Sequence, residues 1–263
     1  MNLRITCLCL LSLILTYVPS FSRADYLVAD WGYGAVLRYS DSGEFLGEFA
    51  HGVHSVSLAI DGEGSVFIAD QSARCIHWYT ASGMFVTTLK CGIPNMRTIV
   101  FDKKLKCLYA TRWDGGEIFK ITLDGTVTLL INSDIPRLGQ LAVSSDGRIY
   151  APDIVRSQVR VFDTNGQDHG IFVNGYTMSA VCDSMDHVHL VLEDRVCSFN
   201  SQAHHLSSSD RSTSGWALAV NHQGDLLSLN SFNRIRRYSN SGVWMADINI
   251  PEAWFALDIV HVE

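Results

Sequence analysis

The chain has 263 residues, with 20 Lys and Arg against 27 Asp and Glu, and a formal net charge of −7 at pH 7. Scattered basic residues in an acidic protein do not form the clustered cationic surface that binds nucleic acid, so that class of partner is not expected. The chain has only five prolines and no Gly/Ser-rich or charged tract, which predicts one continuous globular unit.

The first 24 residues have the pattern of a signal peptide. One basic residue precedes an apolar run, Ile5–Val18, and small residues at Ser22 and Ala24 precede Asp25 with the spacing that signal peptidase prefers. The run is shorter than the roughly 20 apolar residues of a membrane span, which argues against an anchor. We expect an exported protein, secreted or periplasmic, with one domain at residues 25–263.

Five cysteines remain after the expected cleavage, and an odd number leaves at least one thiol outside any intramolecular disulfide. Cys75 and Cys91 flank a hairpin predicted near Ser82-Gly83 and are the candidate pair. A register slip of one residue would put their side chains on opposite faces, so this disulfide stays open at this point. No cysteine pair has the CxxC spacing typical of structural zinc or redox sites.

A repeat of about 40 residues is the strongest pattern in the chain. Glycines that follow Ser, Asp or Asn stand 40, 42 and 41 residues apart, and a last one follows after 76 residues: Gly43, Gly83, Gly125, Gly166 and Gly242. The long gap has room for one degenerate turn, which we place at Gln202-Ala203. Alternating apolar runs flank each turn, as in Ala35–Tyr39 and Glu44–Phe49, so each repeat is predicted to contain a β-hairpin.

Two further apolar runs precede each hairpin, such as Val56–Ile60 and Ser65–Ala69. Four short strands in about 40 residues are typical of one blade of a β-propeller. A sustained 3.6-residue period is absent from the sequence, so helices are not expected. A β-sandwich is the main alternative, but sandwiches do not repeat at a steady interval.

The two ends of the predicted domain indicate how the ring closes. The domain begins with a second-strand segment, Tyr26–Ala29, and ends with an isolated first-strand segment, Trp254–Leu257. Together they complete one blade. Five whole blades and this shared blade predict an all-β, six-bladed propeller of four-stranded antiparallel blades, closed by its terminal strands.

The repeats resemble NHL repeats. The resemblance is carried by Leu58–Asp70 with Arg74–Tyr79, and by Leu141–Asp153 with Val159–Asp163, and it covers almost all of residues 25–263. It implies a six-bladed propeller of the superfamily that includes gluconolactonase/regucalcin-like and streptogramin-lyase-like proteins. Such propellers include binding platforms, lyases, lactonases and esterases, so the resemblance implies the fold and leaves the function open.

Acidic residues recur where predicted strands end. We expect them to be turn residues that accept hydrogen bonds from nearby backbone amides rather than catalytic groups. Those after the first strands are Asp61, Asp102, Asp183 and Asp258, and those that close second strands are Asp30, Asp70 and Asp153.

Candidate binding residues come from the loops that enter the innermost strands, because these loops surround the channel of a propeller. Aligned on the turns, one polar residue of each blade falls at the channel mouth, with one cation and two aromatic residues just behind; ordinary polar loop residues are the alternative. The mouth column is His54, Asn95, Arg137, Tyr176 and Ser214, with Glu252 displaced by one place, and the residues behind it are Arg97, Trp216 and Trp254.

A divalent metal in the channel is possible but not favoured. Gluconolactonase-like enzymes hold one with a Glu, two Asn and an Asp, and Asn95 resembles one of these asparagine positions. Arg137 stands where the family would place its Asp, and a fixed positive charge opposes a metal. Asn95 and Glu252 alone fall short of the about six to eight oxygen ligands of calcium. His187 and His189, two apart on a predicted strand, are expected to be structural rather than metal ligands.

Two functions remain open. The first is an exported, monomeric, non-catalytic propeller that binds a small molecule or a protein through its channel face. The alternative is a propeller lyase or lactone hydrolase, in which His54, Tyr176 and Glu252 supply general acid–base chemistry, as the resemblance to propeller lyases implies. A structural envelope or matrix protein, with a channel plugged by its own side chains, is a third possibility.

Overall fold

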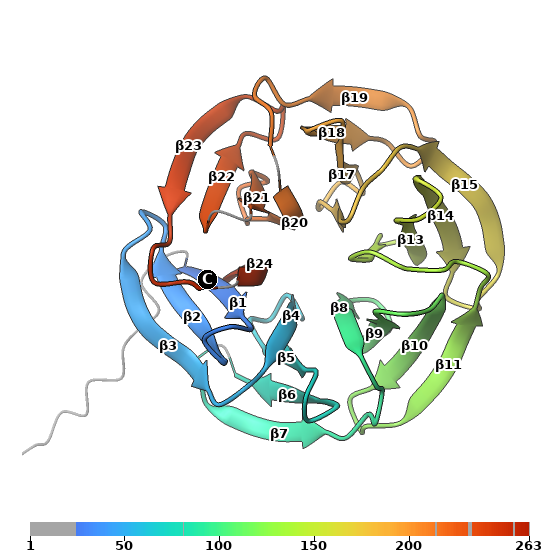
Figure 1. The fold of residues 1–263 in the computed structure, drawn as a ribbon. Helices are drawn as coiled ribbons and strands as arrows, with labels where there is room; N and C mark the ends of the chain where they lie inside the picture. Colours follow the sequence, from blue (N-terminus) through green and yellow to red (C-terminus); the bar gives the residue numbers. More distant parts are fainter. Residues whose placement is uncertain (1–24, 81, 214, 231–232, 255, 263) are drawn as a thin grey trace, which may run out of the picture.

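The computed structural model describes residues 25–80, 82–213, 215–230, 233–254 and 256–262. Within these ranges the chain forms six antiparallel sheets of four strands each and no helix, and the sheets stand as blades around a central channel (Figure 1). The predicted all-β, six-bladed propeller is confirmed. The predicted signal peptide and Ser214 lie outside the described residues. The described part contains no helix long and apolar enough to cross a bilayer.

The strands follow the chain from the channel outward in each blade, and only the first blade combines both ends of the chain. That blade has β24 (Ala256–Val262), β1 (Asp25–Asp30), β2 (Ala35–Ser40) and β3 (Phe45–His51). The second blade has β4 (Ser55–Ile60), β5 (Val66–Asp70), β6 (Cys75–Tyr79) and β7 (Phe85–Leu89). The third blade has β8 (Met96–Asp102), β9 (Cys107–Arg112), β10 (Glu117–Thr122) and β11 (Val127–Asn132). The fourth blade has β12 (Ala142–Val143), β13 (Arg148–Asp153), β14 (Gln158–Asp163) and β15 (Asp168–Asn174). The fifth blade has β16 (Ala180–Cys182), β17 (Val188–Leu192), β18 (Arg195–Phe199) and β19 (His205–Ser208). The sixth has β20 (Gly215–Val220), β21 (Leu226–Asn230), β22 (Arg234–Tyr238) and β23 (Trp244–Asn249).

The ring closes by antiparallel pairing of β24 with β1, in which Val28 lies opposite Ile259. The prediction of a shared blade is confirmed, but the predicted bounds of the closing strand, Trp254–Leu257, are wrong. The strand begins at Ala256 and continues to Val262 because the buried apolar residues of this segment extend that far, whereas Trp254 is 73% exposed.

The core lies between blades rather than inside any one blade. Six clusters of buried apolar side chains each combine residues of two neighbouring blades. Between the first and sixth blades, for example, Tyr26 and Leu37 pack with Leu227 and Ile235. Because each blade buries its two faces only against its neighbours, the stability of every blade depends on the closed ring.

The hairpin turns explain the glycine repeat. Gly166 has φ of 86°, and its amide donates to the carbonyl of Asp163 over 3.0 Å. Ala203 holds the equivalent place with φ of 62°, and its amide donates to Asn200 over 3.0 Å. The predicted degenerate turn is therefore confirmed, with alanine in the left-handed conformation that favours glycine.

Three of the four first-strand acids are turn residues as predicted. Asp61 accepts from the amides of Glu63 and Ser65, and Asp102 and Asp183 make the same kind of contact in their blades. The acids that close second strands, Asp30, Asp70 and Asp153, each accept from the amide three residues on. The prediction is wrong for Asp258, which lies inside β24 and is buried.

Cys75 and Cys91 are free thiols in the structure, as are Cys107, Cys182 and Cys197. The register of β6 and β7 places Ile76 opposite Leu89, and the amide of Gly92 donates to the carbonyl of Arg74. Cys91 therefore lies beyond the end of β7, one residue past the position opposite Cys75. Burial raises the pKa of both thiols to about 11.

Candidate functional site

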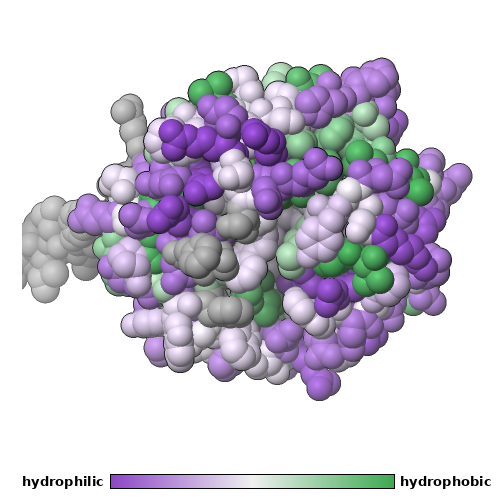
Figure 2. Space-filling view, turned by 45° about the horizontal axis from the view of Figure 1, so that its top comes forward, coloured by the Kyte–Doolittle hydropathy of each residue, from purple (hydrophilic) through white to green (hydrophobic). Residues whose placement is uncertain are grey.

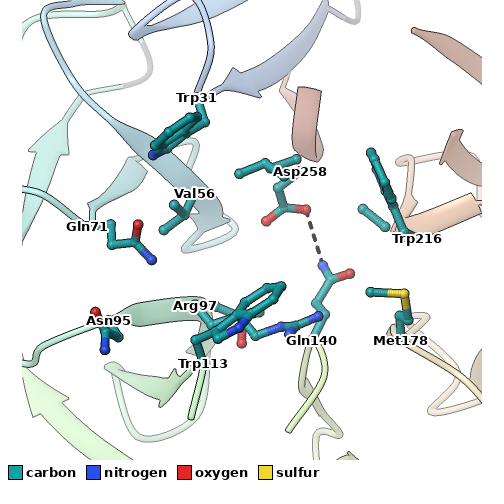
Figure 3. Close-up of a pocket in the computed structure, with 13 residues that line it drawn as sticks. Trp31, Val56, Gln71, Asn95, Arg97, Trp113, Gln140, Met178, Trp216 and Asp258 are labelled. Carbon is teal, nitrogen blue, oxygen red and sulfur yellow. Dashed lines mark hydrogen bonds between the residues drawn. The ribbon is translucent and has the colours of Figure 1, made fainter. Parts of the chain in front are cut away.

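A recess of about 520 Å³ opens at the end of the channel where the innermost strands begin (Figure 3). This size is typical of sites for small ligands. Its lining comes from the starts of the innermost strands and from the loops between second and third strands. The residues are Trp31, Val56, Gln71, Asn95, Arg97, Thr98, Trp113, Gln140, Met178, Trp216, Ala217, Leu257 and Asp258.

Three tryptophans give the recess flat apolar walls. Trp31 follows β1, Trp113 follows β9, and Trp216 lies in β20 against the core between the first and sixth blades. Trp31 and Trp113 are nearly half exposed, at 44% and 48%. In a space-filling view, mostly hydrophilic side chains surround paler and hydrophobic ones near the middle of the face (Figure 2). Such walls suit a planar apolar group.

Arg97 is the cation of the recess. It is only 9% exposed, its guanidinium carbon lies 4.1 Å from the centre of the Trp113 ring, and its Nη1 has no hydrogen-bond partner among the described residues. Burial and the nearby charge of Arg137 lower the pKa of Arg97 to about 10, so it stays charged at neutral pH. The guanidinium thus combines ring stacking with unused hydrogen-bond donors.

A belt of polar contacts crosses the channel and touches all six blades. In one half, Ser57 Oγ donates to Asp258 Oδ2 over 2.7 Å and accepts from the amide of Ile99 over 3.1 Å. In the other half, Ser179 Oγ donates to Gln140 Oε1 over 2.5 Å and accepts from the amide of Leu218 over 3.0 Å.

Gln140 joins the two halves of this polar belt. Its Nε2 lies 3.4 Å from Asp258 Oδ1 and 3.3 Å from the carbonyl oxygen of Leu218 (Figure 3). Gln140 and Asp258 also line the recess, so the belt fixes part of its wall.

Asp258 is a buried carboxyl in the recess. Burial raises its pKa to about 6, although the amides of Leu58 and Ile259 and the hydroxyl of Ser57 donate to it and favour the charged form. Perturbed groups in a cavity are typical of functional sites. Here both carboxylate oxygens already accept hydrogen bonds from the belt and the backbone.

The structure brings together only part of the predicted site. Asn95, Arg97 and Trp216 line the recess. Arg137 lies beside it, with its guanidinium carbon 5.7 Å from the Trp113 ring centre. The other predicted residues that the structure describes are exposed and do not line the recess: His54, Tyr176, Glu252 and Trp254. His54 packs instead against Trp31, with ring centroids 6.2 Å apart.

Sequence reasoning missed Trp31, Gln71 and Trp113, which directly follow second strands, together with Gln140, Met178 and Asp258. The sequence did contain a pattern that could have identified the residues after second strands. Trp31 and Gln71 each follow an Ala-Asp pair, and these pairs end β1 and β5. The prediction considered only loops that enter innermost strands. Asp258 was misassigned because its spacing matches the turn acids of other blades.

His187 and His189 both contact Asp183, at 3.1 and 3.3 Å. His189 is buried and also lies 2.8 Å from Ser198 Oγ. Burial opposes ionisation of Asp183, but hydrogen bonds from His189 and from the amides of His187 and Met185 hold its pKa at about 2. The pair therefore acts as a structural hydrogen-bonded cluster in the fifth blade.

A second hollow, of about 820 Å³, lies at the other end of the innermost strands and is lined by the first turns of the blades. Its carboxylates are engaged by the protein itself. Asp102 and Asp183 accept from turn amides, and Asp186 accepts from the amide and hydroxyl of Ser145. The first recess, with its unused cationic donors, is therefore the stronger candidate site.

Solved structures with the same fold include binding proteins and lyases. The chain superposes on a chain of the nidogen/laminin complex with a TM-score of 0.80 and 15% identity, covering 91% of this chain and 98% of the other. It is similar to a protein of unknown function from Bacteroides caccae, with a TM-score of 0.70 and 16% identity over 92% of this chain and 100% of the other. It is also similar to virginiamycin B lyase from Staphylococcus aureus, with a TM-score of 0.63 and 12% identity over 86% of this chain and 80% of the other. No protein-family model and no curated protein matches the chain.

These similarities confirm the fold, which this chain shares with a chain of the nidogen/laminin complex and with two lyases. With its fold and recess, the molecule is a six-bladed β-propeller with a ligand-sized hollow at one mouth of its channel. Identities of 12% to 16% carry no residue roles from one protein to another.

Proposed function

We propose that the protein is an exported, monomeric propeller that binds a small molecule in the channel recess without transforming it. The observation that carries this proposal is the set of three tryptophans, from three blades, around a hollow of about 520 Å³. Apolar walls with a few polar groups are the usual construction of a small-ligand site. The structural similarity to a chain of the nidogen/laminin complex supports a binding role, and a protein ligand is the main alternative occupant.

A lyase or lactone hydrolase remains the second candidate because virginiamycin B lyase shares the fold. Its candidate groups, His54 and Glu252, are exposed and outside the recess, and Asp258 inside the recess already accepts hydrogen bonds on both oxygens. General acid–base catalysis needs a group within hydrogen-bond reach of the substrate. The geometry therefore favours binding over turnover.

The test is a thermal-shift screen of a metabolite panel against residues 25–263, with Trp113→Ala and Trp254→Ala as matched variants. Trp113 lines the recess, whereas Trp254 is more exposed and does not. A ligand at about 100 times its Kd should add about 2.7 kcal/mol of stability to the wild type and to Trp254→Ala. The Trp113→Ala protein should lose most of this shift.

Two results would contradict the proposal. One is a panel that shifts neither the wild type nor Trp254→Ala, or that shifts Trp113→Ala equally. The other is turnover of a lactone panel that disappears in His54→Ala or Glu252→Ala, which would establish the enzyme alternative.

A further inference from the structure

No acidic side chain in the described part of the chain forms an ion pair with Arg97. The side chain is more than nine-tenths buried, and its Nη1 finds no hydrogen-bond partner in the described part of the chain. A buried charge without a partner is unfavourable, because the lost hydration is not replaced. Arg156 shows the usual solution, since it pairs with Asp134 and Asp153 at 3.1 Å each.

A second guanidinium adds to the positive field. The guanidinium carbons of Arg97 and Arg137 lie 4.1 and 5.7 Å from the centre of the same Trp113 ring. The Nε of Arg137 is also without a hydrogen-bond partner among the described residues. Two like charges that share one ring repel each other, so this arrangement favours an added anion.

The nearby carboxylates are engaged elsewhere. Asp114 accepts from Asn95 at 3.2 Å and lies 3.3 Å from Arg112. Asp258 accepts hydrogen bonds from Ser57, Gln140 and backbone amides. Neither carboxylate is hydrogen-bonded to Arg97, so neither neutralises its charge beside the apolar walls.

We propose that the recess binds a small planar or aromatic monocarboxylate, with its carboxylate on Arg97 and its flat body against the tryptophans. This inference rests on the proposed function and names the class of its ligand. A carboxylate matches the paired donors of a guanidinium. A single charge fits better than a phosphate dianion, because Asp258 adds a carboxyl group to the same wall. The flat body occupies the surface of Trp31, Trp113 and Trp216.

The binding test compares 2-naphthoate with its uncharged isostere 2-naphthamide by titration calorimetry at millimolar ligand. The wild type should bind the acid at least about tenfold more tightly than the amide, because a charged hydrogen bond is lost in the amide. Arg97→Met should bind both equally, and Arg137→Met should keep a reduced preference. Equal wild-type affinities, or a preference that persists in Arg97→Met, would overturn the carboxylate assignment while leaving the binding function intact.

The other outcomes are distinct. If neither probe binds, the proposed small-molecule function fails together with this inference. A blocked Trp-Asp peptide offers the same charge on a protein-like chain, and tighter binding of this peptide than of 2-naphthoate would assign the recess to a protein ligand.

A stability measurement tests the role of Arg97 without any ligand. If the guanidinium serves binding, then Arg97→Met removes an unpaired buried charge and should raise the thermal midpoint by about 2–4 °C. The control Arg156→Met removes a paired charge and should not raise it. A lower midpoint, or loss of folding, in Arg97→Met would show that Arg97 serves the fold and would overturn the inference.

Discussion

At the scale of single residues, burial in the channel shifts the pKa of two ionisable side chains, Arg97 and Asp258. Arg97 is buried with no acidic partner among the described residues, and Asp258 is buried within the polar belt. Arg97 stacks on Trp113 of its own blade, whereas Asp258 is hydrogen-bonded to Ser57 and Gln140 of two other blades. The environment of Asp258 is therefore not determined by its own repeat.

Asp258 should make stability depend on pH. Its folded pKa of about 6 lies above the ordinary value of 3.8, so its contribution is complete below pH 3.8 and is lost as pH rises through 6. Asparagine does not ionise, so Asp258→Asn removes this loss of stability at higher pH. Relative to the wild type, the variant should gain about 1 kcal/mol in unfolding free energy between about pH 5 and about pH 8.

Urea unfolding at the two pH values measures this difference. The control is Asp61→Asn, which changes a turn carboxyl outside the recess. A difference between Asp258→Asn and the wild type that stays constant with pH would rule out titration of Asp258 in this range.

At the scale of elements, the hairpin turns are the features that the sequence pattern describes best. Gly43, Gly83, Gly125, Gly166 and Gly242 all have φ between 81° and 87°. Glycine was recognisable there because the turn requires a positive φ. Ala203 was found only by its spacing, since alanine carries no comparable preference.

Ala203→Gly should stabilise the protein by about 1 kcal/mol, because it relieves an L-residue from the left-handed conformation. Gly125→Ala should lower the free energy of unfolding by a similar amount. A Cβ there would meet no atom within 4 Å, so only the cost of the left-handed conformation remains. Gly166→Ala should cost more, because its Cβ would lie 2.5 Å from the carbonyl oxygen of Leu130. Urea midpoints rank the three variants, and a destabilised Ala203→Gly would contradict this account of the turn.

At the scale of the whole molecule, we expect the ring to unfold as one cooperative unit. Its apolar clusters lie between blades, β24 and β1 close the first blade, and the polar belt links all six blades through Gln140 and Asp258. A change at the closing strand is therefore expected to affect every blade.

Removal of residues 256–263 should abolish the sharp unfolding transition, because the first blade loses its innermost strand and the belt loses Asp258. Calorimetry and near-UV circular dichroism measure the loss. A synthetic peptide of residues 256–263 should restore the transition, whereas a scrambled peptide should not. An unchanged melting temperature of the truncated protein would show that pairing of β24 with β1 does not close the ring.

The sequence by itself determined the number of blades, their four-strand order, the hairpin turns and the shared closing blade. These features follow from local periodicity, which the alternation of strands and the conformational demands of turns write into each repeat. Only the tertiary structure decided the bounds of β24, the free thiols and the composition of the recess. Trp31 and Asp258 of the first blade meet Arg97 and Trp113 of the third blade because the blades converge on one axis, and convergence of separate repeats leaves no local pattern along the chain.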